Sequence, residues 1–162
     1  MSEQGFTHLD ASGAARMVDV TGKDVSVRSA TATGRVLVSA EVVAALRGQG
    51  VPKGDAIAVA RIAGIQAAKR TPDLVPLCHP IAIHGVTVDL EVHDDHVAVS
   101  ATVRTADRTG VEMEALTCVA VAGLAMIDMV KALDPAAVIT DVRVEEKLGG
   151  KTGEWHRPGD PA

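Results

Sequence analysis

Two charged side chains interrupt the most apolar stretch of the sequence. Asp128 and Lys131 lie within residues 119–133, where most other positions are apolar. Their spacing of three residues places both side chains on one face of a helix. The pair can be a partly buried ion pair, or it can transfer protons, because a lysine beside a carboxylate in a sheltered site is common in acid–base catalysis. The residues alone leave both interpretations open.

A second chemical candidate is the segment Leu77-Cys78-His79-Pro80. His79 could act as a general acid or base, and it could equally be a loop histidine held by a backbone carbonyl. Cys78 fits a buried, inert thiol better than a nucleophile. A zinc site could be assembled from Cys78, His79, His84, His93 and His96. Their spacing lacks the paired ligands of zinc sites, so we predict no metal.

Basic side chains in the first half of the chain suit an anionic ligand. Lys53 precedes a predicted helix start, where its charge opposes the helix dipole, and this indicates a bound anion. Further basic groups are Arg28, Arg61, Lys69 and Arg70. Ordinary surface solvation would explain each of them as well.

A glycine-rich segment, Gly149-Gly150-Lys151-Thr152, resembles the end of a P-loop. We reject a P-loop because Glu145 stands where that motif requires glycine and because no helix is predicted to follow. The segment still carries Lys147 and Lys151 and could close over an anion. The alternative is a solvated tail.

Two acidic residues, Glu112 and Glu114, open the long predicted helix, and ordinary compensation of the helix dipole explains them. From Glu114 to Asp128 is 14 residues, or about 21 Å along a helix and about 40° around it. The two face the same way but are too far apart to act on one atom. If both serve active sites, a site is shared between subunits. An Asp128→Ala chain and a Lys53→Ala chain are then expected to complement each other.

The periodicity predicts the elements that position these residues. Residues 25–38 read as a strand with a bulge near Ser29. Helices follow over 40–47 and 56–70, and the second has an apolar stripe of Val59, Ile62, Ala63 and Ile65. A long helix over 110–133 is apolar nearly all round. A last strand covers 138–144, and residues 147–162 read as a mobile tail.

Strict alternation predicts a hairpin over residues 84–92 and 97–103. Folding it about Asp94-Asp95 pairs Val92 with Val97, Leu90 with Val99, Val88 with Ala101 and Val86 with Val103. The order β-α-β-β-α-β then indicates an α+β fold, a ferredoxin-like sandwich with one added helix and an antiparallel sheet. We expect residues 1–162 to form a single domain, with 1–16 and 147–162 flexible.

Composition excludes several classes of protein. The 162 residues carry a net charge of −5 and are 47% hydrophobic, as in an ordinary globular domain. One Phe, one Trp and no Tyr argue against a base-stacking platform for nucleic acid. No uninterrupted apolar run reaches the roughly 18 residues of a membrane span. Without an export signal, the two cysteines are expected to be thiols of a cytoplasmic protein.

The motifs together resemble the molybdenum-cofactor biosynthesis protein C family. They are MVDV (17–20), KGD (53–55), ARIAGIQAAKRT (60–71), LCHP (77–80), TGVEMEALT (109–117), DMVK (128–131) and GGK (149–151). The resemblance implies a cyclic pyranopterin monophosphate synthase, a lyase without cofactor. Its substrate would be 3′,8-cyclo-7,8-dihydroguanosine 5′-triphosphate, made by a radical S-adenosylmethionine enzyme, and its second product pyrophosphate. It also implies a hexamer built as a trimer of dimers.

Site roles follow from the same resemblance. It implies catalytic roles for Asp128, Lys131, Lys53 and His79. It implies substrate contacts for Leu77, Cys78, His79, Glu112, Met113, Glu114, Arg28, Lys69 and Lys147. Two other classes stay open on the residues alone: a non-catalytic ferredoxin-like assembly module, and a zinc hydrolase using His79, which would require bound metal.

Overall fold

The central strand of the sheet is β1 (Ser26–Leu37), which pairs with a strand on each side. The computed structural model describes residues 7–48 and 51–159. Its other strands are β2 (Gly85–Val92), β3 (His96–Asp107), β4 (Val138–Leu148) and β5 (Trp155–His156). The strands form one antiparallel sheet in the order β2-β3-β1-β4-β5. This confirms the α+β, ferredoxin-like arrangement, with β5 added at one edge.

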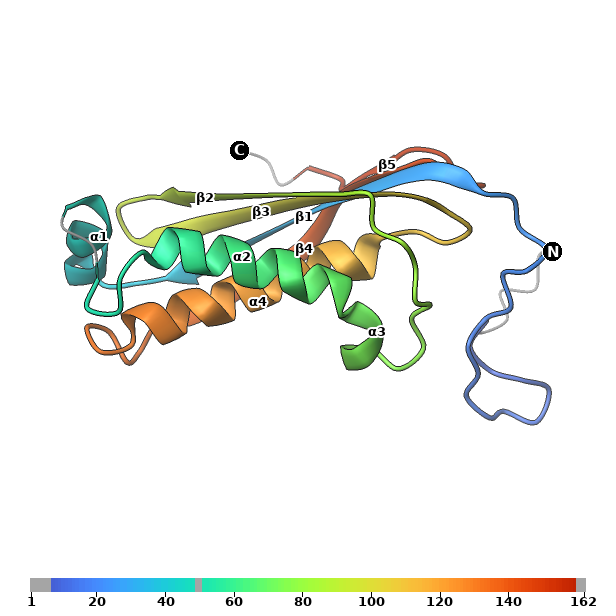
Figure 1. The fold of residues 1–162 in the computed structure, drawn as a ribbon, viewed down its shortest axis with the longest axis horizontal. Helices are drawn as coiled ribbons and strands as arrows, with labels where there is room; N and C mark the ends of the chain where they lie inside the picture. The colour runs from blue at the N-terminus through green and yellow to red at the C-terminus, as the bar shows by residue number, and fades with distance from the viewer. Residues whose placement is uncertain (1–6, 49–50, 160–162) are drawn as a thin grey trace.

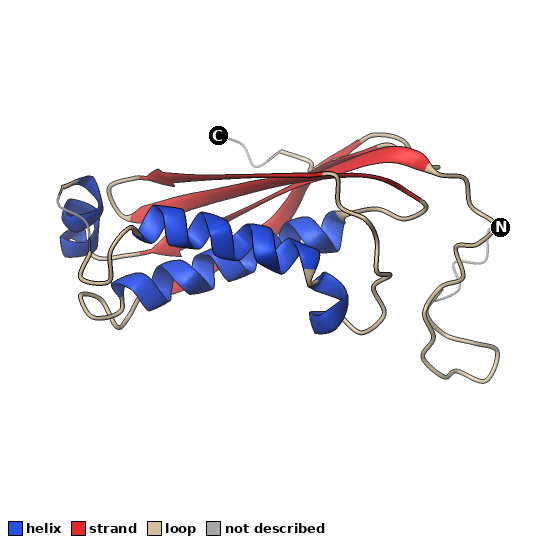
Figure 2. Cartoon of the chain, viewed as in Figure 1, coloured by secondary structure: helices blue, strands red, loops and turns tan. Residues whose placement is uncertain are grey.

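The two long helices lie side by side on one face of the sheet, whose other face carries no helix in the described part of the chain (Figures 1 and 2). The helices are α1 (Ala40–Arg47), α2 (Ala56–Lys69), α3 (Thr71–Leu74) and α4 (Glu112–Val130). α2 and α4 run in opposite directions, so the end of α2 lies toward the start of α4 (Figure 1). α1 covers one end of the molecule.

The hairpin of β2 and β3 has the predicted register. Val92 pairs with Val97, Leu90 with Val99, Val88 with Ala101 and Val86 with Val103. The apolar side chains of β3 are buried beneath the helices. As the lack of aromatic residues requires, the core consists mainly of Val and Ala, and Met126 is its largest fully buried side chain.

The predicted apolar stripe of α2 is wrong at Val59 and Ile62, whereas Ile65 is partly buried against the core. The buried positions are Ala56, Ala60, Gly64, Ala67 and Ala68, whereas Val59 and Ile62 are 42% and 57% exposed. Close packing explains the choice: a Cβ atom at residue 64 would lie 3.0 Å from the carbonyl oxygen of Cys118 in α4. Small residues let the two helix backbones approach, and Val59 and Ile62 are turned outward.

The bulge predicted near Ser29 is also wrong. β1 pairs with β3 without interruption from Ser26 to Leu37. The irregularities lie in the pairing with β4, between Thr31 and Ala32 and between Thr33 and Arg35. The bulge was predicted because Val25 and Val27 alternate out of phase with the apolar residues after Ser29. No bulge is needed to explain this, because Val27 is 77% exposed and belongs to no buried face.

α4 has the length and mean hydropathy of a membrane span, 19 residues with a hydropathy of 1.8. Counting only uninterrupted apolar runs missed this. Half of that stretch is buried against the rest of the chain, as in the core helix of a soluble protein.

The chain after residue 147 has more regular structure than its composition predicts. β4 continues through Leu148, and β5 pairs Trp155 with Lys147 and His156 with Glu146. Flexibility of residues 1–16 and 147–162 stays a prediction. Residues 1–6 and 160–162 lie outside the described residues.

Candidate active site

α4 carries a polar cluster at each of its ends. Glu112, Met113 and Glu114 form its first turn, and Asp128 lies in its last turn, with Lys131 as the C-cap residue. Asp128 lies fourteen positions after Glu114, which corresponds to about 21 Å of helix. The two ends are therefore separate sites within one chain.

At the C-terminal end, two lysines share one carboxylate oxygen. Oδ1 of Asp128 accepts hydrogen bonds from Nζ of Lys131 at 2.7 Å and from Nζ of Lys53 at 3.0 Å. Lys53 comes from the turn before α2, whose N-cap Asp55 accepts a hydrogen bond from the backbone N–H of Ala58. The hydrogen bonds from Lys131 and Lys53 lower the pKa of Asp128. We call these three residues the lysine–aspartate cluster.

The exposure of this cluster differs from the prediction. A partly buried or sheltered pair was expected, but the side chains of Lys53, Asp128 and Lys131 are 43%, 55% and 56% exposed. The outward position follows from the helix, since Met129 and Val130 take the buried positions of that turn. Exposed ion pairs stabilise a fold weakly. The direct contact of Lys53 with Asp128 was not predicted: spacing indicated an anion ligand at Lys53, and the family resemblance implied a catalytic role without a partner.

At the N-terminal end, a cavity of about 300 Å³ brings together residues from three segments. Leu77, Cys78 and His79 line it from the loop before β2, opposite Glu112, Met113 and Glu114 of α4. We call it the α4 N-terminal cavity. The structure therefore gathers six of the predicted substrate-contacting residues.

Glu114 is the buried acid of this cavity, with 3% of its surface exposed. Burial raises its pKa to about 7, and the neighbouring Glu112 carboxylate adds to the effect. Burial, together with the charge of Glu114, also raises the pKa of the Cys78 thiol. A neutral thiol is a poor nucleophile. Groups with a pKa near the working pH transfer protons best, so the cavity favours Glu114 rather than Cys78 for proton transfer near neutral pH.

His79 is held by the backbone, as one of its two interpretations predicted. Its Nε2 lies 2.6 Å from the carbonyl oxygen of Val18. This contact orients the ring against the cavity without excluding a role in chemistry. The wall that includes Val18 and Val20 was not predicted as part of a site. Its sequence signal was the MVDV motif, to which no function had been given.

Arg28 and Lys147 line a small adjoining cavity of about 110 Å³, together with Glu112. Nζ of Lys147 lies 3.2 Å from Oε1 of Glu112, and Nε of Arg28 donates to the carbonyl oxygen of Asp107 at 3.2 Å. Lys69 is exposed in the last turn of α2, at the end of that helix nearest the start of α4. These cations lie toward the same end of the molecule.

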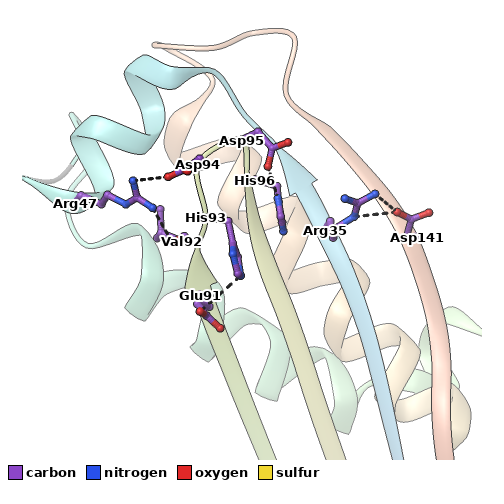
Figure 3. Close-up of polar contacts among 9 residues, drawn as sticks. All are labelled: Arg35, Arg47, Glu91, Val92, His93, Asp94, Asp95, His96 and Asp141. Carbon is purple, nitrogen blue, oxygen red and sulfur yellow. Dashed lines mark hydrogen bonds and ion pairs between the residues drawn. The ribbon is translucent and has the colours of Figure 1, made fainter. Parts of the chain in front are cut away.

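The residues of the zinc alternative do not come together. Cys78 and His79 precede β2, whereas His93 and His96 follow it and stack with ring centroids 4.5 Å apart (Figure 3). Parallel rings do not direct their nitrogens at one ion. His93 faces Glu91, and His96 contacts Asp95 at 2.6 Å. No group of three or more metal-ligating side chains occurs among residues 7–48 and 51–159.

A wider groove of about 840 Å³ crosses the helix-free face of the sheet. Thr33, Arg35, Ser100 and Asp141 line it with neighbouring strand residues, and Arg35 pairs with Asp141 (Figure 3). None of the residues predicted from the sequence to form the site lies there. The larger volume is therefore not the better candidate.

Comparison with known proteins covers nearly the whole chain. The MoaC family model matches residues 17–150. A cyclic pyranopterin monophosphate synthase of Nocardioides sp. is 68% identical over 97% of this chain and 98% of its own length. One of Streptomyces coelicolor is 69% identical over 94% and 89%. Cyclic pyranopterin monophosphate synthase 2 of Mycobacterium tuberculosis is 56% identical over 94% and 91%. The motifs that suggested the resemblance lie within these matches, and the chain belongs to the MoaC family.

Proposed function

We propose that this chain is a cyclic pyranopterin monophosphate synthase. It converts 3′,8-cyclo-7,8-dihydroguanosine 5′-triphosphate to cyclic pyranopterin monophosphate and releases pyrophosphate, which makes it a phosphorus–oxygen lyase of molybdenum cofactor biosynthesis. The observation that carries the proposal is the 68% identity, over nearly the full length of both chains, to a protein of that name. The two polar clusters on α4 supply suitable chemistry.

The lysine–aspartate cluster is proposed to carry proton transfers. Opening the purine-derived ring and closing the pyran ring both require protons to move. Asp128 stays ionised because Lys131 and Lys53 donate to it, and each lysine can exchange a proton with a bound substrate. Lys53, Asp128 and Lys131 are thus the proposed catalytic residues of this end.

The α4 N-terminal cavity is proposed to hold the substrate rings and the phosphates. Glu114, with its pKa near 7, can hold or release a proton at neutral pH, and His79 is a second candidate. The cations Arg28, Lys69 and Lys147 would stabilise the negative charge that develops as pyrophosphate departs. Leu77, Cys78, Glu112 and Met113 line the same cavity.

A complete site is proposed to need two chains. Within one chain, the residues at the two ends of α4 are too far apart to act on the same atom of a small molecule. Outward-facing apolar side chains on the helical layer supply an association surface: Val59, Ile62 and Leu124 are 42%, 57% and 60% exposed. Such side chains are typical of interfaces between subunits. We propose a homo-oligomer, a hexamer built as a trimer of dimers.

The remaining proposals concern the surroundings of the enzyme. A radical S-adenosylmethionine enzyme that cyclises GTP would supply the substrate. The reaction would take place in the cytoplasm, without nucleic acid, membrane or metal.

The direct test is incubation of the purified protein with the cyclised dihydro-GTP. We expect cyclic pyranopterin monophosphate and one pyrophosphate per turnover, and no loss of activity with a chelator. Absence of both products would overturn the proposed function. Activity that disappears with chelator and returns only with a transition metal would overturn the metal-independent mechanism and favour the zinc hydrolase.

A further inference from the structure

The loop between β4 and β5 lies directly against the guanidinium of Arg28. Gly149 and Gly150 both have left-handed backbones, with φ of 85° and 78°. A Cβ atom added at residue 150 would overlap Nη1 of Arg28 and lie 3.0 Å from its Cζ. The three atoms nearest to that position all belong to the guanidinium. Apart from the two neighbouring residues, the Arg28 guanidinium is therefore the nearest described part of the chain to a Cβ atom at residue 150.

The neighbouring glycines show that this contact is specific. A Cβ atom at residue 149 would overlap the backbone carbonyl of Val27, so Gly149 is required for the path of the loop. Gly153 has a left-handed φ of 69° and open space around it. A left-handed backbone therefore does not by itself bring a glycine against a side chain. Residue 150 therefore lacks room for a side chain because of Arg28, and not because of the conformation of the turn.

Arg28 is held at two points. Its Nε donates to the carbonyl oxygen of Asp107. The backbone of Gly150, which carries no side chain, limits where Nη1 of the guanidinium can lie. Both points keep the guanidinium at the cavity that it shares with Lys147 and Glu112. A guanidinium fixed in this way binds phosphate oxygens with little further ordering, because its donors are planar and rigid.

We propose that Gly150 is a positioning residue, which sets the orientation of the Arg28 guanidinium for a polyphosphate group. The inference rests on the proposed function in that the polyphosphate is that of the substrate. The inference goes beyond the proposed function because it gives Gly150, the second of the two left-handed glycines, a defined role. A side chain at residue 150 would displace the guanidinium and leave the strands in place.

The test compares Gly150→Ala with Gly153→Ala. Both variants place alanine at a left-handed position, and only the first meets Arg28. Binding of inorganic triphosphate, measured by calorimetry, makes the readout independent of turnover. We expect Gly150→Ala to weaken binding by about tenfold or more, since charge-assisted hydrogen bonds are lost. We expect less than about a twofold change for Gly153→Ala.

A double-mutant cycle separates positioning from general damage. In an Arg28→Ala background, Gly150→Ala should have no further effect on triphosphate binding, because its target is gone. If Gly150→Ala lowers the melting temperature more than Gly153→Ala does, that difference should disappear in the Arg28→Ala background. The Nε–H resonance of Arg28 should shift in Gly150→Ala and stay in place in Gly153→Ala.

Three results would overturn the positioning role. The first is equal triphosphate binding by the two glycine variants. The second is that Gly150→Ala weakens triphosphate binding as much in the Arg28→Ala background as in the original chain. The third is no triphosphate binding by the unmodified protein. If the unmodified protein binds triphosphate and obeys the cycle but makes no cyclic pyranopterin monophosphate, the proposed function fails while the role of Gly150 stands.

Discussion

Nζ of Lys53 lies 3.0 Å from Oδ1 of Asp128, although 75 residues separate them in the chain. The contact joins the turn before α2 to the last turn of α4, and Lys131 donates to the same oxygen. One carboxylate cannot neutralise two ammonium groups, so the cluster keeps a net positive charge. Under the proposed function, this exposed cluster would attract an anionic substrate while Asp128 holds the lysines in place.

Lys131→Ala is expected to lower kcat by at least about 100-fold, the usual scale for loss of a general acid or base. Lys131→Arg should not restore kcat, because arginine stays protonated near neutral pH. The melting temperature should hardly change in either variant, since the ion pair is exposed. Steady-state kinetics and thermal melting of the same preparations provide the measurement.

An exposed ion pair elsewhere gives the matched control for this variant. Arg47 pairs with Asp94 at the turn of the β2–β3 hairpin, with both side chains exposed. Arg47→Ala should leave kcat and the melting temperature near their original values. Equal loss of turnover in Arg47→Ala and Lys131→Ala would show that the lysine has no special role.

The burial of Glu114 predicts a pH-dependent stability. Its pKa is about 7 in the folded chain and near 4.5 when exposed, so the folded state holds a proton that the unfolded state has lost. The free energy of unfolding should therefore fall as the pH rises from about 4.5 to about 7, and level off above that. The contribution of Glu114 to this fall is at most roughly 3–4 kcal/mol, because one pKa unit corresponds to about 1.4 kcal/mol.

Glu114→Gln should remove that component, because an amide does not titrate. Denaturant unfolding from pH 5 to 8 compares this variant with the original chain. Glu41→Gln is the control, since Glu41 is exposed in the first turn of α1 and is not among the groups that raise the pKa of Glu114. A pH slope that persists in Glu114→Gln and vanishes in Glu41→Gln would contradict the assignment.

The local part of the fold could be predicted from the sequence. Alternation over residues 84–103 determined the hairpin register, because a shift by one residue would turn every apolar side chain to the other face. The face of α2 could not be predicted in this way. Periodicity weights large apolar residues, whereas the packing with α4 required Gly64 and the alanines. That preference depends on the distance between two helices, which the sequence of one helix does not contain.

The sequence predicted which residues belong to the candidate site better than it predicted which of them contact one another. Asp128 and Lys131 share a helical turn, so their contact followed from spacing. The approach of Lys53 to Asp128 depends on α2 and α4 running antiparallel, and the walls at Val18 and Val20 depend on a loop without regular structure. Such contacts are set by tertiary packing, and no short-range pattern encodes them.

The exposed apolar side chains of α2 and α4 predict how the chain associates. Ile62→Asp and Leu124→Glu should each shift the protein toward smaller species, because a charge at a subunit contact is costly to desolvate. Sedimentation at micromolar concentration measures the change. Val25→Asp is the control, since Val25 is 56% exposed just before β1 and belongs to neither helix. Unchanged sedimentation of both helix variants would exclude this surface as an interface.

Complementation between chains tests whether the two ends of α4 meet in one site. Lys53 and Asp128 lie in the same cluster of the same chain, so Asp128→Ala and Lys53→Ala, which were expected to complement, should not. The informative pair is Lys131→Ala with His79→Ala, one change at each end. If a dimer holds two sites, each built from opposite ends of the two chains, every mixed dimer keeps one intact site.

Co-expression of the Lys131→Ala and His79→Ala chains in equal amounts should then give about a quarter of the original activity, because half of the dimers are mixed and half of their sites are intact. Lys131→Ala with Lys53→Ala should give none beyond the single variants, since every site in every dimer then carries one change. Activity of the first mixture no higher than that of its parents would contradict a shared site. It would mean that each chain brings its substrate to one end of α4 alone, and that the other cluster serves a different purpose.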